Sequence, residues 1–204
     1  MSTRMIPGGR TPAKTTVLLI GPMCAGKSTL AALLSKRLDL PRIEMDDIRW
    51  DYYAEIGYDS QKAARLAQSD EGMMALIQYW KPFEAHAVAR ALEEHQGCVL
   101  DFGAGHSVFE DEALLEKVET ALAPFKNVFL ILPTPDPVES VEVLNRRFRQ
   151  LLEREVGHVD ERLLRLNEHF VRHPSNRRLA KHVVYTKGRT PEDTCQEILK
   201  GLEK

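Results

Sequence analysis

Residues 21–28 read Gly-Pro-Met-Cys-Ala-Gly-Lys-Ser, and this stretch decides the fold. It matches the pattern Gly-x4-Gly-Lys-Ser, whose glycines permit a tight turn in which backbone N–H groups face inward and bind phosphate oxygens. A short apolar run at 15–20 precedes it, and apolar residues recur at helical spacing over 27–38. The sequence therefore predicts a phosphate-binding loop between a buried strand and a helix, and with it a nucleoside triphosphate ligand.

The rest of the chain alternates between short apolar runs and stretches with helical spacing. Further strands are predicted at 42–45, 98–100, 127–132 and 182–185. Helices are predicted at 110–122, 138–154, 161–171 and 191–202, and the region 46–96 is expected to be mainly helical. Strands that alternate with helices indicate βαβ units. The expected fold class is α/β: a P-loop three-layer sandwich with a five-stranded parallel sheet, helices on both faces and a helical lid.

Composition and charge exclude several classes of protein. The formal net charge is −2, although residues 142–189 carry twelve basic and six acidic residues. A basic stretch within an acidic chain suits phosphate contacts better than a nucleic-acid interface. No apolar run approaches the roughly 18 residues of a membrane span. The three cysteines are far apart and odd in number, which argues against a disulfide framework and favours a reducing, cytoplasmic location. Neither nucleic acid nor a membrane is an expected partner.

The loop and its flanks supply the expected nucleotide site. Lys27 is expected to bridge the β- and γ-phosphate oxygens, and Ser28 is expected to ligate Mg²⁺, so ATP and Mg²⁺ are the expected cofactors. The residues of this site from the loop and the helix start are Gly21, Met23, Cys24, Ala25, Gly26, Lys27, Ser28 and Thr29.

A carboxylate is expected to support the metal opposite Ser28. Glu44 lies near the end of the second predicted strand, and Asp101 ends the apolar run Cys98-Val99-Leu100. Asp101 fits the pattern of an acid after a buried strand slightly better, and the sequence does not separate the two. Both remain candidate metal residues together with Ser28.

Several short segments follow the phosphate loop in an order typical of one family. They are Glu44-Met45-Asp46, Trp80-Lys81-Pro82-Phe83-Glu84, Gly103-Ala104-Gly105, Arg149-Gln150-Leu151-Leu152, Arg172-His173-Pro174-Ser175-Asn176 and Thr186-Lys187-Gly188-Arg189-Thr190-Pro191. The acid pair ends nineteen residues after Lys27. On these segments, over about residues 15–200, the chain resembles the shikimate kinases, within the nucleoside-monophosphate-kinase-like group of P-loop proteins.

The resemblance implies roles for individual residues. Asp46 would bind the substrate hydroxyls and take the proton of the attacking one, and Arg149 would neutralise charge on the transferring phosphoryl group. Lys81 stands where the family has an Arg that grips the substrate carboxylate, and it lacks the bidentate fork of Arg. The implied substrate-binding set is Asp46, Lys81, Gly103, Ala104, Gly105 and Arg172. Arg189 and Pro191 would belong to the adenine loop.

A mobile lid is expected around the phosphates because phosphoryl transfer needs positive charge that also excludes water. Arg146, Arg147 and Arg149 lie on one predicted helix, and Arg146 is a further candidate for nucleotide binding. The expected organisation is a flexible tail at 1–14 and a single P-loop kinase domain at 15–204. Within this domain, about 46–96 would bind the acceptor and about 146–172 would form the lid.

The expected function is ATP- and Mg²⁺-dependent phosphoryl transfer to a hydroxyl of a small molecule, with shikimate as the first candidate. One alternative is a kinase for another small metabolite, an antibiotic or a nucleotide. Another is a P-loop ATPase or switch module with no phosphoryl acceptor. A small-molecule acceptor is the expected partner, and the chain is expected to be a monomer.

Three histidines lie outside these motifs, and the sequence indicates their roles less specifically. His169 and His173 are four residues apart and could share a helical face, as metal-binding pairs do. No third ligand accompanies them in the sequence, and Pro174 ends the helix, so a metal site is not predicted there. His106 follows Gly105 and could contact the substrate, although a solvated loop position is the expectation.

Overall fold

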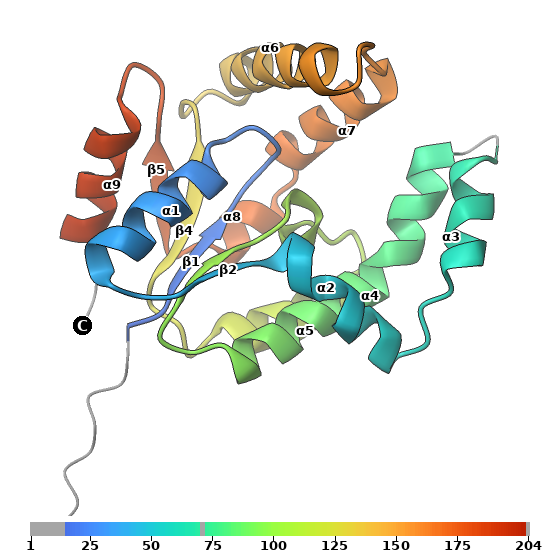
Figure 1. Cartoon of the computed structure of the whole chain (residues 1–204), viewed down its shortest axis with the longest axis horizontal. Helices are drawn as coiled ribbons and strands as arrows, with labels where there is room; N and C mark the ends of the chain where they lie inside the picture. Colours follow the sequence, from blue (N-terminus) through green and yellow to red (C-terminus); the bar gives the residue numbers. More distant parts are fainter. Residues whose placement is uncertain (1–14, 70–71, 203–204) are drawn as a thin grey trace, which may run out of the picture.

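A computed structural model of the chain describes residues 15–69 and 72–202 (Figure 1). The predicted N-terminal tail, residues 1–14, lies outside the described residues. Strands and helices alternate along the described part of the chain, and most of their bounds fall within two residues of the predicted ones. Periodicity and turn residues are therefore sufficient to locate these elements.

Five parallel strands form one sheet, which confirms the predicted fold class. In chain order they are β1 (Val17–Ile20), β2 (Arg42–Glu44), β3 (Val99–Asp101), β4 (Val128–Leu132) and β5 (His182–Tyr185). Their spatial order is β2-β3-β1-β4-β5, and every neighbouring pair is parallel. β1 is central, and all four of its side chains are buried, as a strand covered on both faces requires.

Helices cover the two faces of the sheet and extend from one side of it (Figure 1). They are α1 (Lys27–Leu38), α2 (Met45–Glu55), α3 (Ser60–Ala67), α4 (Gly72–Glu94), the 3₁₀ helix η1 (Ala104–Ser107), α5 (Glu112–Leu122), α6 (Pro137–Glu155), α7 (Glu161–Arg172), α8 (Ser175–Leu179) and α9 (Pro191–Lys200). The short helices η1 and α8 were not predicted, because four or five residues show no helical periodicity. Among the described residues, no helix has both the length and the apolar character to cross a membrane.

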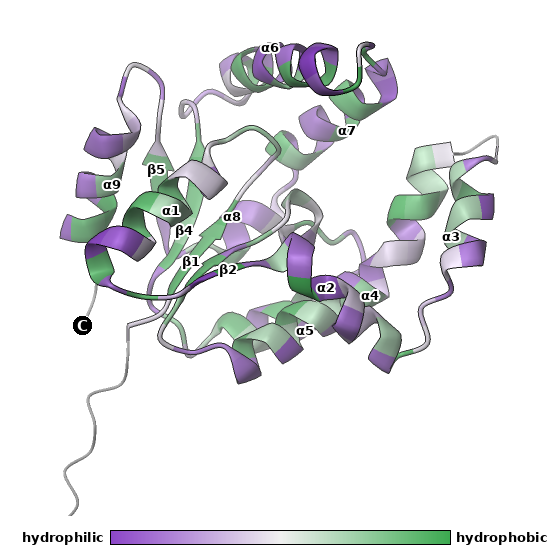
Figure 2. Ribbon diagram, viewed as in Figure 1, coloured by the Kyte–Doolittle hydropathy of each residue, from purple (hydrophilic) through white to green (hydrophobic). Residues whose placement is uncertain are grey.

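Two hydrophobic cores lie on opposite faces of the sheet. Along β1 the side chains alternate: Val17 and Leu19 belong to the core that includes α1 and α9, whereas Leu18 and Ile20 belong to the core that includes α4 and α5. The same alternation runs along β4, and both strands are hydrophobic throughout (Figure 2). This arrangement is the predicted three-layer sandwich.

The region between β2 and β3 forms a helical extension built around aromatic side chains. Trp50, Tyr53, Tyr58, Tyr79, Trp80 and Phe83 make a continuous set of ring contacts with centroid separations of 5.1–6.4 Å. Trp80 also donates its indole N–H to the Tyr58 hydroxyl at 3.1 Å. These contacts hold α2, α3 and α4 together at the edge of the sheet, within the segment 46–96 that was expected to bind the acceptor.

The predicted lid segment, 146–172, consists of the second half of α6 and the whole of α7. Phe148 and Leu152 from α6 and Leu164 from α7 pack together and against Met23 and Cys24 of the phosphate loop. The helices stack along one edge of the molecule (Figure 1). The segment therefore covers the loop through apolar contacts.

Candidate active site

The phosphate loop has the backbone conformation that its glycines were expected to permit. Gly21 has φ = 137°, and a Cβ there would lie 2.6 Å from the carbonyl oxygen of Ile131. Gly26 has φ = 97° and directly precedes the first turn of α1. Both positions are strained for any other residue, so the loop closes tightly beside the N-terminus of α1, where free backbone N–H groups favour anions.

Lys27 is buried within this loop. Its Nζ donates to the carbonyl oxygens of Gly21 at 3.0 Å and Pro22 at 3.1 Å. Burial lowers the pKa of Lys27, and the nearby carboxylates of Asp101 and Asp46 oppose that shift. The ammonium group thus lies between the loop and two acids, which is where a bridging contact to phosphate oxygens is expected.

Of the two metal candidates, Asp101 has the more suitable surroundings. It is only 6% exposed, and its Oδ1 has no hydrogen-bond partner among the described residues. Burial raises the pKa of Asp101, whereas the Lys27 ammonium and the Ser28 hydroxyl lower it. A buried carboxylate oxygen without a partner, beside a serine hydroxyl, fits a hard divalent cation such as Mg²⁺.

Glu44 is the neighbour of Asp101 in the parallel register of β2 and β3. Its side chain is 40% exposed and forms an ion pair with Arg42 at 2.9 Å. Glu44 therefore already has a cationic partner, which makes it the weaker of the two candidates for a metal ligand.

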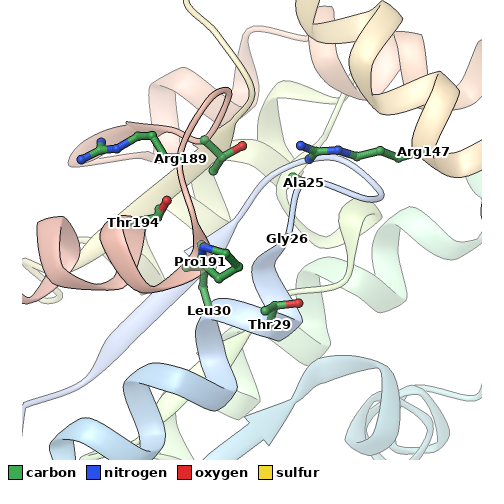
Figure 3. Close-up of a pocket in the computed structure, with 9 residues that line it drawn as sticks. Ala25, Gly26, Thr29, Leu30, Arg147, Arg189, Pro191 and Thr194 are labelled. Carbon is green, nitrogen blue, oxygen red and sulfur yellow. The ribbon is translucent and has the colours of Figure 1, made fainter.

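Two pockets share the phosphate loop. The first is lined by Ala25, Gly26, Thr29, Leu30, Arg147, Thr186, Arg189, Pro191 and Thr194 (Figure 3). In Figure 3, Arg147 reaches from α6 over Ala25, and its Nη1 donates to the carbonyl oxygen of Cys24 at 3.4 Å. Because the loop between β5 and α9 closes the opposite wall, this pocket has the right components for the base and sugar of a nucleotide.

The second pocket joins the phosphate loop to the ends of β2 and β3. Its lining includes Lys27, Ser28, Glu44, Asp46, Asp101, Gly103 and Ala104, with Met23, Cys24, Phe102, Phe148 and Leu151 completing the walls. These residues come from segments up to 128 positions apart and meet at the carboxyl ends of parallel strands, where ligands bind in such sheets. This cavity brings together Lys27, Asp46, the three candidate metal residues, Gly103 and Ala104. The other predicted residues of the acceptor and catalytic sets, Lys81, Gly105, Arg149 and Arg172, do not line it.

Asp46, Gly103 and His106 pack closely at the inner wall of this second pocket. A Cβ on Gly103 would lie 2.6 Å from Oδ1 of Asp46 and 2.7 Å from Nδ1 of His106, so only glycine fits between the two side chains. Asp46 also forms an ion pair with Arg49, one helical turn further along α2, at 3.3 Å. Gly103 therefore fixes the approach of the Asp46 carboxylate to the end of β3.

His106 is buried, which contradicts the expectation of a solvated loop residue. It is 1% exposed because η1 folds this segment against α4, and neither ring nitrogen has a hydrogen-bond partner among the described residues. Burial lowers the pKa of His106 to about 3, against the effect of the Asp46 carboxylate. The imidazole is therefore neutral, and it lies beside the carboxylate that was predicted to act as the base.

Lys81 and Glu84 form a buried ion pair on α4, with Nζ 2.6 Å from Oε2 and both residues 3% exposed. Lys81 also donates to the carbonyl oxygen of Gly105 at 3.0 Å. A Cβ on Gly105 would collide with the Glu84 carboxylate. The glycine at this position thus allows the loop after β3 to close over the ion pair.

Three predicted arginines lie outside the two pockets. Arg149 forms an ion pair with Glu161 at 2.9 Å, and Arg172 forms one with Glu168 at 2.8 Å. Arg172 lines a separate pocket between β4, α6 and the end of α7. Arg146 is exposed on α6. In the arrangement described, Arg147 is the lid arginine closest to the loop, and sequence reasoning had singled it out only as one of a cluster.

Asn167 is a further contact that sequence reasoning missed. Its buried Oδ1 accepts the backbone N–H of Met23, in the phosphate loop, at 3.0 Å, and its amide nitrogen lies 3.3 Å from Oδ1 of Asn145. A lone Asn at a core-facing position of α7 is the only sequence signal for it. The contact links the predicted lid segment directly to the phosphate loop.

The chain is similar to several known proteins. The family described as "AAA domain" matches residues 17–156. A shikimate kinase of Streptomyces avermitilis is 29% identical over 187 residues, covering 92% of this chain and 95% of the relative. The structure of the shikimate kinase from Acinetobacter baumannii in complex with shikimate superposes with a TM-score of 0.58 at 21% identity, covering 91% of each chain. A gluconokinase from Sinorhizobium meliloti superposes with a TM-score of 0.54 at 13% identity, covering 92% of this chain and 91% of that one. Both structures share the fold.

Proposed function

Because the chain belongs to the AAA-domain family, we propose that it transfers the γ-phosphoryl group of ATP to a hydroxyl of a small molecule, with shikimate as the first candidate. It is a shikimate kinase-like member of the P-loop small-molecule kinases, so the resemblance predicted from its motifs is confirmed. The observation that carries the proposal is the single pocket that holds Lys27, Ser28 and Asp101 together with Asp46.

In the proposed reaction, the acceptor oxygen forms a bond to the γ-phosphorus while the bond from that phosphorus to the bridging oxygen of ADP breaks. Asp46 orients the acceptor hydroxyl and takes its proton late in the step. Lys27 stabilises the charge on the phosphate oxygens, and Arg147, or Arg149 after it leaves Glu161, adds positive charge from the lid. The products are ADP and a phosphate monoester.

Mg²⁺ is the proposed cofactor, with Ser28 and Asp101 as its protein ligands and Glu44 beside them. When bound, the ion neutralises charge on the β- and γ-phosphate oxygens. Ser28 ends the loop and Asp101 ends β3, so these two residues would hold the ion between the phosphate loop and the sheet. The unpartnered Oδ1 of Asp101 supports this assignment.

The acceptor end of the pocket allows a second candidate. The Lys81 ammonium is already bound to Glu84, so its charge is largely neutralised and its grip on a substrate carboxylate is weaker than that of a free arginine. Arg49, whose guanidinium lies 4.4 Å from the centre of the Trp50 ring, is a further cation near Asp46. A sugar acid, the class that gluconokinase is named for, carries hydroxyls and a carboxylate as shikimate does, so it is the second candidate acceptor.

The proposal is tested by measuring ADP release from Mg·ATP with shikimate, with gluconate and with neither. Shikimate-dependent turnover that Lys27→Ala lowers about a hundredfold or more would support the first candidate. Turnover with gluconate alone would change the proposed acceptor but still support a kinase activity. Hydrolysis at the same rate with and without every acceptor tested would instead favour the ATPase alternative.

A further inference from the structure

Glu110, His169 and His173 bring three potential metal ligands together near the C-terminal end of α7, outside the two pockets that share the phosphate loop. One ligand atom from each residue lies within 4.8 Å of the others. The Nε2 of His169 lies 2.7 Å from Oε1 of Glu110, and the two imidazole rings have centroids 5.1 Å apart. The histidine pair thus has the third ligand that the sequence did not reveal, because Glu110 lies 59 positions before His169.

The three ligands come from two segments that are distant in the chain. His169 lies in the last turn of α7 and His173 caps its C-terminus, whereas Glu110 belongs to the loop between η1 and α5. Glu110 and His169 have side chains that are 34% and 36% exposed, so a metal ion can reach them and both can rotate. Tetrahedral ligands about 2.0–2.1 Å from Zn²⁺ are about 3.3 Å apart, which requires only small side-chain movements from the separations present.

The charges around the cluster also suit a cation. Burial raises the pKa of Glu110, but the hydrogen bonds from His169 and from its own backbone N–H, together with the Lys81 charge, lower it, and the net shift is downward. Lys81 is the neighbouring cation, and its charge is paired with Glu84 at 2.6 Å.

A buried serine orients one of the histidine ligands. Ser175 Oγ lies 2.8 Å from Nδ1 of His173 and donates its hydrogen to the carbonyl oxygen of Phe109 at 3.1 Å. The backbone N–H of Ser175 also donates to Nδ1 of His173 at 3.3 Å, so Ser175 contacts this ring nitrogen twice and fixes the orientation of the imidazole. Hydrogen-bond partners orient metal-binding histidines in this way. Phe109 precedes Glu110, so the same hydroxyl connects both ligand-bearing segments.

We propose that Glu110, His169 and His173 bind one Zn²⁺, with water in the fourth position. Two imidazoles and one carboxylate are a set that zinc prefers, whereas Mg²⁺ prefers oxygen ligands. The ion would join the C-terminus of α7 to the loop before α5. Since the same helix contacts the phosphate loop through Asn167 and Met23, the zinc would brace the base of the lid against the sheet.

The test uses the full chain without a histidine tag, stripped of metal with a chelator and titrated with Zn²⁺ against a chromophoric competitor in excess Mg²⁺. We expect one equivalent to bind and the thermal midpoint to rise with zinc. The double variant His169→Gln/His173→Gln should bind at least about tenfold more weakly and lose the thermal shift. His158→Gln, at an exposed histidine between α6 and α7, is the matched control and should bind like the wild type.

Two further measurements keep the outcome decisive. Co²⁺ substituted for zinc should give the intense visible absorption of a four- or five-coordinate site in the wild type, and Glu110→Gln should change that spectrum. If circular dichroism shows that the double variant His169→Gln/His173→Gln is unfolded, zinc binding is compared between the wild type and Glu110→Gln instead. No zinc uptake in excess Mg²⁺, or equal affinity in the wild type and the ligand variants, would overturn the proposal.

Discussion

Nζ of Lys81 lies 2.6 Å from Oε2 of Glu84, and both side chains are almost completely removed from solvent. Lys81 is the residue that, by the motif resemblance, would bind the substrate carboxylate. Because the Lys81 ammonium is already paired with Glu84, a ligand carboxylate must compete with Glu84 for it. The pair therefore links the stability of the fold to the choice of acceptor.

Removing one partner of this pair should destabilise the fold more than removing both. Lys81→Met leaves the Glu84 carboxylate buried without a counter-charge, at a cost of about 3–5 kcal/mol in the free energy of unfolding. The double variant Lys81→Met/Glu84→Gln removes both charges and should recover most of that loss. Urea denaturation of the wild type, the single variant and the double variant measures the difference. Equal stabilities for the two variants would mean that the pair does not act as a buried unit.

Gly103→Ala should impair turnover through Asp46. The new Cβ would meet Asp46 Oδ1 at 2.6 Å and His106 Nδ1 at 2.7 Å, so the carboxylate must move away from its present position. We expect kcat to fall about a hundredfold, because a displacement near 1 Å at a reacting group has that effect. ATP affinity should change little. Gly201→Ala is the control, since its new Cβ would have only ordinary contacts at 3.6–3.8 Å; unchanged kcat in Gly103→Ala would remove Asp46 from the proposed role.

Asp101→Asn should separate the two metal candidates. We expect it to raise the Mg²⁺ concentration needed for half-maximal ADP release far more than Glu44→Gln does, because Asp101 is buried beside Ser28 and Glu44 is paired with Arg42. The folded state also raises the pKa of Asp101, so its ionised form is disfavoured by folding and the cost persists above the unfolded pKa. Asp101→Asn should therefore not lower the thermal midpoint at pH 7. A larger Mg²⁺ effect from Glu44→Gln would reverse the assignment.

The sequence correctly predicted the elements that depend on local backbone conformation. The loop at 21–28 and strands β1 and β4 follow from glycine spacing and apolar runs, and the structure has them at the predicted places. Contacts between distant segments could not be derived in this way. The rotation of α6 decides that Arg147 rather than Arg149 lies over the loop, and residues two positions apart on a helix face different directions.

The burial of polar side chains could not be predicted from the sequence either. His106 follows two small residues and has the context of an exposed turn, yet η1 packs it inside the molecule. Glu110 and Asn167 likewise have no local signal for their partners, since these partners lie 59 and 144 positions away. Such contacts depend on the tertiary fold, so they require coordinates.

Asn167 should control how firmly the lid holds the phosphate loop. Asn167→Ala removes the acceptor for the Met23 N–H and should lower the free energy of unfolding by about 1–3 kcal/mol. Hydrogen exchange at the Met23 amide should accelerate in the variant, and exchange at the buried amides of β1 should follow only the global loss. As a matched change on the same helix, Glu168→Ala removes an exposed ion pair and should leave Met23 unaffected. Equal protection of Met23 in Asn167→Ala would contradict the link between lid and loop.

His106 should make the fold sensitive to acid. Its folded-state pKa is lowered to about 3, below the ordinary value near 6.5, so the unfolded chain takes up a proton first as the pH falls. Protonation of His106 therefore does not affect the free energy of unfolding well above pH 6.5, and it lowers that free energy progressively as the pH falls from 6.5 to 3. At pH 5 the loss is about 2 kcal/mol relative to pH 7. His106→Phe should remove that part of the acid sensitivity, whereas His158→Gln, at an exposed site, should retain it. The measurement is the free energy of unfolding by urea at pH 7 and pH 5 for all three proteins, and an equal pH dependence in His106→Phe and the wild type would show that His106 does not titrate as a buried neutral group.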